Sequence, residues 1–234
     1  EADPKNHEVW ALLCLTYLEL WPYTYQDTQD KRTLSYATQR VSKVNLGGVS
    51  ASTCQTVNLI LQGRLDESKT VTESVLANYG SQGKPPTVFY YLKALQLKSE
   101  RNFDVGVGYA RSTQKLWPAW IRVYALEAEL HERTKNYTYA AAIYRNILKS
   151  NTKHNFSKIK LGLLELKHFN HVELASQLLN EAFQSNDLPV GSVTSKGYMG
   201  LAEIALRYNN QDEAIKFAKK AYILNPSNTQ AKNL

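Results

Sequence analysis

The chain has 234 residues, of which 43% are hydrophobic and 21% are charged, and this balance excludes a disordered chain. The 11 glycines and 7 prolines are too few for a many-stranded β-sandwich, and no stretch is apolar enough to span a membrane. The net charge of +7 suits nucleic acid, anionic membranes and acidic proteins alike, so it excludes none of these partners.

The first third of the chain predicts two helix pairs with weak patterns. In residues 5–46, apolar residues at helical spacing are interrupted by residues 21–30, which combine a proline with aromatic and polar residues. In residues 50–79 the main recognisable pattern is Leu65-Asp66-Glu67-Ser68, which resembles a weak version of the turn that leads into the second helix. We expect an irregular segment at 21–30 and one helix pair in each of the two regions.

The two cysteines, Cys14 and Cys54, lie inside apolar helical runs and have no CxxC or Cys/His spacing around them. We therefore expect buried free thiols, which favour a reducing compartment. The predicted location is cytoplasmic. The alternative is periplasmic, if a signal peptide was removed upstream of Glu1.

From residue 87 onward the repetition is regular. Ala94, Ala128 and Gly162 follow one another at a spacing of 34 residues, and each unit contains two amphipathic stretches joined by a polar turn. The clearer units are residues 87–118, 119–152, 153–187 and 193–226, with irregular segments at 80–86 and 187–193. We predict an all-α, right-handed solenoid of six helix pairs, with twelve principal helices.

These positions resemble the tetratricopeptide repeat, a helix–turn–helix unit with small residues at the helix crossing and a closing proline. The unit at 193–226 matches best, from Tyr198 through Ala202 to Pro226. The resemblance covers nearly the whole chain and implies one superhelical domain over residues 1–234. Because both ends look like parts of neighbouring repeats, we expect a fragment of a longer protein.

The sequence contains no motif of a nucleotide-binding loop, a nucleophile elbow or a zinc protease. Glu165, His168 and His171 have a spacing that suggests a metal site. The two histidines flank an expected turn and do not share a helix face, so we favour a solvated turn. We expect no enzyme activity, no cofactor, no metal and no small-molecule substrate.

The resemblance implies a protein-binding scaffold, and two alternatives stay open. One is a nucleic-acid-binding repeat protein that uses the basic stretch 145–168, for which we prefer a solvated outer face. The other is a permanent structural subunit of an envelope or motility assembly. Base reading is disfavoured because the matching first-helix positions are apolar or uncharged: Tyr91, Ala125, Ile159 and Met199.

The binding surface that the resemblance implies is a concave groove lined by the first helix of each pair. The predicted partner-binding residues are Tyr91, Leu95, Lys98, Arg122, Ala125, Glu129, Glu132, Ile159, Leu163, Leu166, Lys196, Met199, Glu203 and Leu206. The Lys and Asn of the family's peptide-carboxylate clamp are missing, so we expect a partner's amphipathic helix or extended apolar segment rather than an acidic chain terminus. For Leu163 or Leu166 alone, burial by neighbouring repeats is an equally good interpretation.

Overall fold

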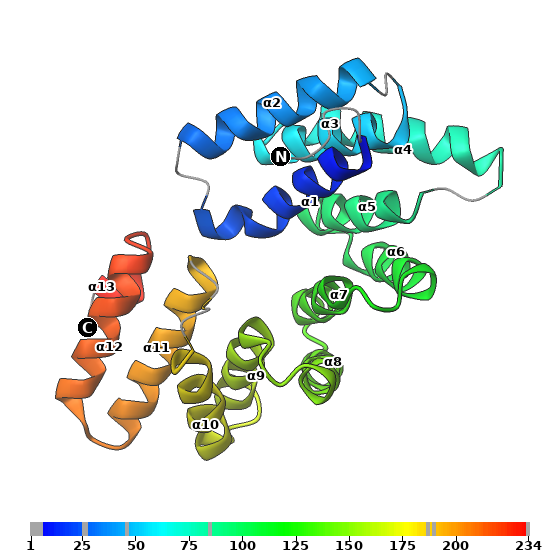
Figure 1. The fold of residues 1–234 in the computed structure, drawn as a ribbon. Helices are drawn as coiled ribbons and strands as arrows, with labels where there is room; N and C mark the ends of the chain where they lie inside the picture. The colour runs from blue at the N-terminus through cyan, green and yellow to red at the C-terminus, as the bar shows by residue number, and fades with distance from the viewer. Residues whose placement is uncertain are drawn as a thin grey trace. The chain divides into compact units, whose positions relative to one another are not determined.

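The computed structural model describes residues 7–24, 28–44, 47–83, 86–185, 188 and 191–232. Within these ranges it contains thirteen helices and no strand (Figure 1). The helices are α1 (His7–Thr24), α2 (Thr28–Val44), α3 (Val49–Leu61), α4 (Leu65–Gly80), α5 (Thr87–Ser99), α6 (Phe103–Leu116), α7 (Ile121–Arg133), α8 (Tyr137–Ser150), α9 (Asn155–Lys167), α10 (Val172–Phe183), α11 (Ser192–Arg207), α12 (Gln211–Leu224) and α13 (Thr229–Lys232). The predicted all-α solenoid of six helix pairs is confirmed, with α13 as a short addition.

The chain divides into two compact units, Glu1–Leu130 and His131–Leu234. In unit 1, α1 packs on α2 and α3, α3 packs on α4, and α5 packs on α4 and α6. The core of this unit includes Leu34, Val57, Phe89, Leu92 and Leu126, all fully buried. The single superhelical domain expected over residues 1–234 stays a prediction.

Unit 2 repeats the same arrangement. Its α9 packs on α8, α10 and α11, and α12 packs on α11 and α13. Ile159, Ala175, Leu179 and Ala182 form a fully buried core between α9 and α10. Within each unit, neighbouring helix pairs therefore bury apolar side chains against one another, as a stacked repeat requires.

One backbone feature recurs in the turn inside five of the pairs. A residue with positive φ occupies the turn in each case: Gly63, Arg101, Lys135, Asn170 and Asn209. After Arg101, the Asn102 N–H donates to the Leu97 carbonyl at 2.9 Å, a bond that spans five residues. This Schellman arrangement satisfies carbonyls at the end of the first helix and reverses the chain within a few residues.

The irregular segment predicted at 21–30 is wrong for the part that the structure describes. α1 continues to Thr24 and α2 begins at Thr28, while residues 25–27 lie outside the described ranges. Pro22 lacks an N–H, so it removes one hydrogen bond near the end of α1, but it does not end the helix.

The break predicted at 80–86 is confirmed for its described residues except the first, and the break predicted at 187–193 is confirmed only in part. Residues 81–83 lie between α4 and α5, although Gly80 still belongs to α4. Gly191 precedes α11, which already includes residues 192–193. Residues 84, 85, 187, 189 and 190 lie outside the described ranges, as do the first six and the last two residues of the chain.

The prediction of two free thiols is wrong. Cys14 of α1 and Cys54 of α3 form a disulfide, with their Cα atoms 5.2 Å apart and both side chains fully buried. The two cysteines are 40 residues apart in the sequence. Only the packing of α1 on α3 brings them within bonding range, so the spacing in the sequence did not reveal the pair.

Removing the disulfide should destabilise unit 1. Cys14→Ala/Cys54→Ala should lower the free energy of unfolding by up to about 4 kcal/mol, because a cross-link over a loop of this length restricts the unfolded chain. Thermal denaturation with and without dithiothreitol measures the effect. The reductant should lower the melting temperature of the parent protein and leave the double variant unchanged. Equal melting of the two proteins without reductant would contradict the cross-link.

Two helical glycines provide a matched test of the packing. A Cβ on Gly197 of α11 would lie 2.8 Å from Phe183 Cζ and 3.0 Å from Ile159 Cγ2, whereas one on Gly108 of α6 would meet no atom within 4 Å. Alanine favours a helix over glycine by about 1 kcal/mol, so Gly108→Ala should raise the melting temperature. Gly197→Ala should lower it, because overpacking costs about 1–3 kcal/mol. Circular dichroism measures the melting temperature of both variants. A higher melting temperature in both would contradict the packing around α11.

Candidate functional site

In unit 2, residues from three helices meet at the carboxylate of Glu132, near the end of α7. Lys160 of α9 donates to its Oε2 at 2.7 Å, and the Tyr144 hydroxyl of α8 donates to its Oε1 at 2.7 Å. A carboxylate with two such donors is well compensated. Glu132 was predicted to contact a partner, and the structure uses its carboxylate within the unit.

The charged side chains around Glu132 affect the pKa of Lys196 in α11. Desolvation lowers the pKa of Lys196 below the usual lysine range, and the positive charges of Lys160, Arg133 and Lys167 lower it further, while Glu132 opposes the change. Lys196 is nevertheless exposed at the surface. The packing places the same residues together: a Cβ on Gly197, next to Lys196, would lie 3.0 Å from Ile159 Cγ2, next to Lys160. Lys160 in turn pairs with Glu132, which adjoins Arg133, and Lys167 lies about two helical turns further along α9. We call Arg133, Lys160, Lys167 and Lys196 the basic cluster.

Accessible apolar side chains accompany the basic cluster on α9 and α11. Leu163 and Met199 are half-buried, and Leu206 is 41% exposed. Leu163 follows Lys160 by three residues and Met199 follows Lys196 by three, so each pair shares one helix surface. This surface therefore combines positive charge with exposed hydrocarbon.

The charged side chains at the end of α11 form hydrogen bonds within unit 2. Arg207 donates to Glu203 at 2.8 Å and to the side-chain oxygen of Asn170 at 2.8 Å. Asn170 lies in the turn between α9 and α10. The predicted site residue Glu203 thus forms part of a link between α11 and this turn.

In unit 1, the predicted site charges pair with one another. Lys98 of α5 forms an ion pair with Glu129 of α7, and Arg122 lies 3.7 Å from the second oxygen of the same carboxylate. Leu95 is half-buried beside them on α5. Two cations therefore share the carboxylate of Glu129.

Four predicted partner-binding residues are buried, which corrects the interpretation of their positions. Tyr91 is 1% exposed, Ala125 and Ile159 are 0% exposed, and Leu166 is 1% exposed. The Tyr91 ring packs on Trp120 with 4.4 Å between centroids. Close packing leaves a partner no access to such positions. The partner contacts of the other ten residues stay a prediction.

Three members of the basic cluster, Arg133, Lys160 and Lys167, are absent from the predicted partner-binding set, although Lys160 and Lys167 belong to the basic stretch 145–168. Lys160 lies two residues before the crossing residue Gly162, a position outside the predicted set. Arg133 and Lys167 are the last residues of α7 and α9 and are themselves 34 residues apart. A recurring cation at the end of successive first helices was therefore the available signal.

The basic stretch 145–168 is less positive in the structure than in the sequence. Carboxylates from other helices neutralise half of its six Lys and Arg side chains: Arg145 pairs with Glu165, Lys158 with Glu181 and Lys160 with Glu132. Lys158 lies 3.0 Å from Glu181 of α10. The stretch therefore helps to join successive helices.

Glu165 is fully buried and connects α8 with the turn that follows α9. Its carboxylate accepts a hydrogen bond from the Arg145 guanidinium, and His171 Nδ1 lies 2.8 Å from its second oxygen. His168 instead stacks on Tyr137, with 3.5 Å between ring centroids. Among the described residues, no group of three or more His, Cys, Asp or Glu side chains is arranged to hold a metal ion.

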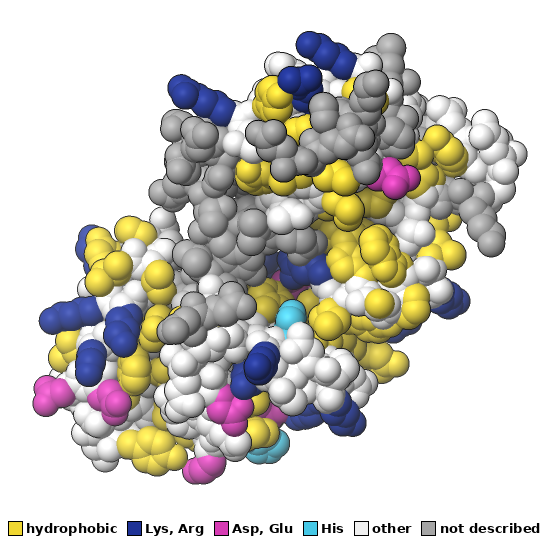
Figure 2. Space-filling view, viewed as in Figure 1, with side chains coloured by type: hydrophobic (Ala, Val, Ile, Leu, Met, Phe, Trp, Pro, Cys, Tyr) yellow, Lys and Arg dark blue, Asp and Glu magenta, His cyan; other side chains and the backbone are white. Residues whose placement is uncertain are grey.

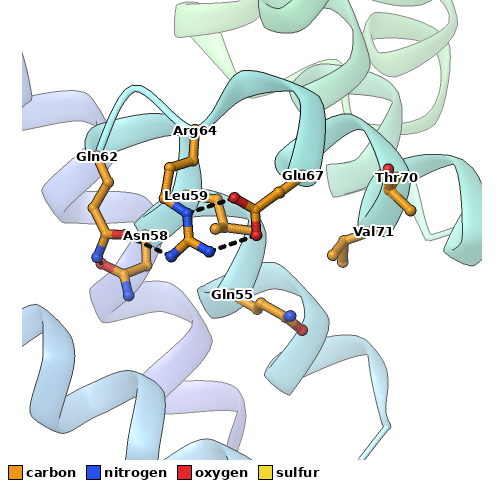
Figure 3. Close-up of a pocket in the computed structure, with 8 residues that line it drawn as sticks. All are labelled: Gln55, Asn58, Leu59, Gln62, Arg64, Glu67, Thr70 and Val71. Atoms are coloured by element: carbon orange, nitrogen blue, oxygen red, sulfur yellow. Dashed lines mark hydrogen bonds and ion pairs between the residues drawn. The ribbon is translucent and has the colours of Figure 1, made fainter.

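A hollow of about 430 Å³ lies between α3 and α4 of unit 1 (Figure 3). Arg64 donates to both oxygens of Glu67, at 2.6 and 2.5 Å, and also reaches Gln62 at 3.3 Å. Figure 3 shows these side chains turned toward one another across the opening. Both charged side chains are more than half exposed, so the pair is a solvated surface contact.

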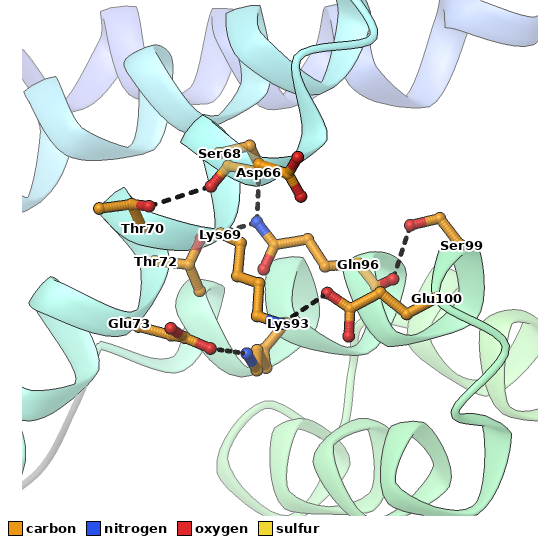
Figure 4. A network of polar contacts seen from close by, with 10 residues as sticks. All are labelled: Asp66, Ser68, Lys69, Thr70, Thr72, Glu73, Lys93, Gln96, Ser99 and Glu100. Carbon is orange, nitrogen blue, oxygen red and sulfur yellow. Dashed lines mark hydrogen bonds and ion pairs between the residues drawn. The ribbon is translucent and has the colours of Figure 1, made fainter.

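A polar network joins α4 and α5 in the same unit (Figure 4). The Gln96 amide nitrogen donates to Ser68 Oγ at 2.6 Å and to Thr72 Oγ1 at 3.0 Å, and all three side chains are buried. Lys93 pairs with Glu73 beside them at 2.6 Å. The network joins two packed helices through the Gln96 amide nitrogen, which is a structural role, while the Gln96 Oε1 is buried without a hydrogen-bond partner among the described residues.

A further apolar surface lies on α12 and α13, where Tyr222 is 40% exposed and Ile223 is 76% exposed. Together with Ile215 and Ala231 they line a hollow of about 490 Å³. Figure 2 shows hydrophobic side chains among Lys and Arg side chains in this part of the molecule. No described helix has both the length and the apolar character needed to cross a bilayer.

No family model and no curated protein matches this chain. Solved structures do resemble it. A structure described as "Functional Characterization of Pseudomonas Aeruginosa pilF" has a TM-score of 0.70 at 12% identity, covering 97% of this chain and 95% of that one. A chain of the APC/C hetero-tetramer Cut9-Hcn1 has a TM-score of 0.72 at 14% identity, covering 99% of this chain and 42% of that one.

A third similar structure is TTC0263, a thermophilic TPR protein of Thermus thermophilus. It has a TM-score of 0.56 at 18% identity and covers 76% of this chain and 92% of that one. At such low identity, a structural likeness shows the fold alone. This chain has the fold of a tetratricopeptide-repeat solenoid, as the spacing of its small residues predicts.

The buried carboxylate of Glu165 should make Arg145 important for stability. Arg145→Met removes its cation and should cost up to about 3–5 kcal/mol, because a buried charge then has weaker compensation. Lys149→Met, an exposed change on the same helix, should alter stability by no more than about 0.5 kcal/mol. Urea unfolding measures both variants. Adding Glu165→Leu to Arg145→Met should restore part of the loss, and equal effects of the two single variants would contradict this role of the ion pair.

Proposed function

We propose that this chain is a non-enzymatic protein–protein interaction scaffold, and that a partner segment binds along α9 and α11 of unit 2. The observation that supports this most is the accessible surface of Leu163, Met199 and Leu206 beside the basic cluster. A surface with both apolar and charged parts suits an amphipathic helix, or an extended segment with alternating apolar side chains.

Three buried or half-buried carboxylates are already used within the fold, which supports a scaffold rather than an enzyme. Glu127 accepts from Arg111 and Gln114, Glu132 from Lys160 and Tyr144, and Glu165 from Arg145. A general acid or base needs an open approach for a substrate, and these carboxylates are occupied by neighbouring helices. The proposal requires no cofactor.

Nucleic acid is the alternative ligand for the basic stretch 145–168. Arg145, Lys158 and Lys160 each pair with a carboxylate, so a phosphate would have to compete with these contacts. The hydrocarbon beside the basic cluster suits a protein segment better than a phosphate backbone. We therefore favour a protein partner.

The disulfide between Cys14 and Cys54 favours an oxidising compartment, and we propose the periplasmic location over the cytoplasmic one. Disulfides persist in the periplasm and in secreted proteins, whereas cytosolic thiols are kept reduced. Because both side chains are fully buried, alkylation with iodoacetamide in denaturant at the moment of cell lysis, followed by mass spectrometry, tests this. Cysteines alkylated without prior reduction would contradict the proposed compartment.

The binding surface can be tested with a matched pair of variants. Met199→Ser/Leu206→Asp changes the apolar side chains of α11, and Ile223→Asp changes the most exposed apolar side chain of α12. We expect the first variant to lose a partner that the parent protein captures from a lysate of its own cells, and the second to retain it, because only the first alters the proposed surface. Quantitative mass spectrometry of the captured proteins measures both.

Circular dichroism should show that both variants keep the helical content and melting temperature of the parent to within a few degrees. If the α11 variant is folded and captures the same proteins as the parent, α9 and α11 do not form the binding surface. If only the Ile223→Asp variant loses the partner, the site lies on α12.

A further inference from the structure

The cations of unit 2 differ in how they are compensated. Arg145, Lys158 and Lys160 each form an ion pair with a carboxylate of another helix. In the part of the chain that the structure describes, no carboxylate pairs with Arg133, Lys167 or Lys196. Within this described part, the basic cluster therefore holds three cations without an ion pair beside the Lys160–Glu132 pair.

Crowding of these cations is unfavourable for the unbound protein. The lowered pKa of Lys196 reflects both its desolvation and the repulsion from Lys160 and Arg133. Glu132 relieves this only in part, because its oxygens already accept from Lys160 and Tyr144. An incoming carboxylate would interact favourably with the whole cluster, since opposite charges a few ångströms apart attract more strongly where water is partly excluded.

The spacing of the cations indicates which class of anion would bind. Its cations come from the end of α7 and from separate positions on α9 and α11, so several spaced charges match them better than one compact ion. Leu163 and Met199 lie one helical turn from Lys160 and Lys196 and offer hydrocarbon between the charges. A segment with both acidic and apolar side chains would meet both features.

We propose that the basic cluster selects an acidic amphipathic segment of a partner protein, with the partner's Asp and Glu side chains at Arg133, Lys167 and Lys196 and its apolar side chains on Leu163 and Met199. This deepens the proposed function and rests on it. Recognition comes from side chains along the segment and does not require a chain terminus. Electrostatic attraction would also speed the encounter and make binding depend on salt.

Three synthetic peptides test the proposal directly. Each has about 15 residues, or about four helical turns, with identical leucines at helical spacing and with Glu, Gln or Lys at all other positions. Fluorescence anisotropy with the full chain gives the three dissociation constants at about 50 mM and about 500 mM salt. We expect the Glu peptide to bind about tenfold more tightly than the Gln peptide at low salt, with the Lys peptide weakest.

Charge-reversal variants locate the effect. Lys167→Glu/Lys196→Glu should weaken binding of the Glu peptide at least tenfold and should remove most of its advantage over the Gln peptide. Lys149→Glu/Lys153→Glu, which makes the same change in net charge at exposed positions outside the basic cluster, should leave binding within about twofold of the parent. Circular dichroism confirms that both variants are folded.

Each other outcome would contradict either the acidic specificity or the scaffold function. If the Glu and Gln peptides bind equally well and both lose affinity with Met199→Ser/Leu206→Asp, the scaffold function stands and the acidic specificity is wrong. If none of the three peptides binds, the proposed function itself is wrong for this surface. If the control reversal weakens binding as much as the cluster reversal, or if a DNA oligonucleotide of similar charge binds as tightly as the Glu peptide, the cluster is a general polyanion surface.

Discussion

A pair of amphipathic helices cannot bury its apolar side alone, and the stacking of each pair on the next is the interaction on which this structure depends. The stacking requires close approach. A Cβ on Gly162 would lie 3.0 Å from Leu179, and Ala202 and Ala214 are fully buried where α11 meets α12. These contacts join neighbouring helices. They therefore bury some side chains of each first helix between the helices and leave others accessible at the surface.

Ion pairs also join neighbouring helix pairs. The second helix of one pair is linked to the first helix of the next by Glu73–Lys93 in α4 and α5, by Arg111–Glu127 in α6 and α7, and by Arg145–Glu165 in α8 and α9. Glu127 and Glu165 are buried, so their partners are needed to offset desolvation. Folding thus compensates much of the charge along the stack. The basic cluster differs because its positive charges outnumber the carboxylates that reach it.

Stabilising contacts occur in both units, whereas the proposed binding surface lies in unit 2 alone. The disulfide and the Gln96 network belong to unit 1, where they hold α1 to α3 and α4 to α5. The basic cluster and its apolar neighbours belong to unit 2. In a repeat protein each element interacts mainly with its neighbours, so one region can be modified for recognition without loss of packing in another.

The spacing of small residues and the helical periodicity determined the six helix pairs, because both depend on residues close together in the chain. The same information selected Lys196, Met199 and Leu206, which are accessible on α11, but it also selected Tyr91 and Ile159, which are buried. Only the tertiary structure paired Cys14 with Cys54, showed that Tyr91 and Ile159 lie in the core, and gathered the basic cluster from three helices. Periodicity predicts which face of a helix is apolar, whereas contacts between residues about 30 or 40 positions apart depend on how the helices cross, and the crossing is decided by packing.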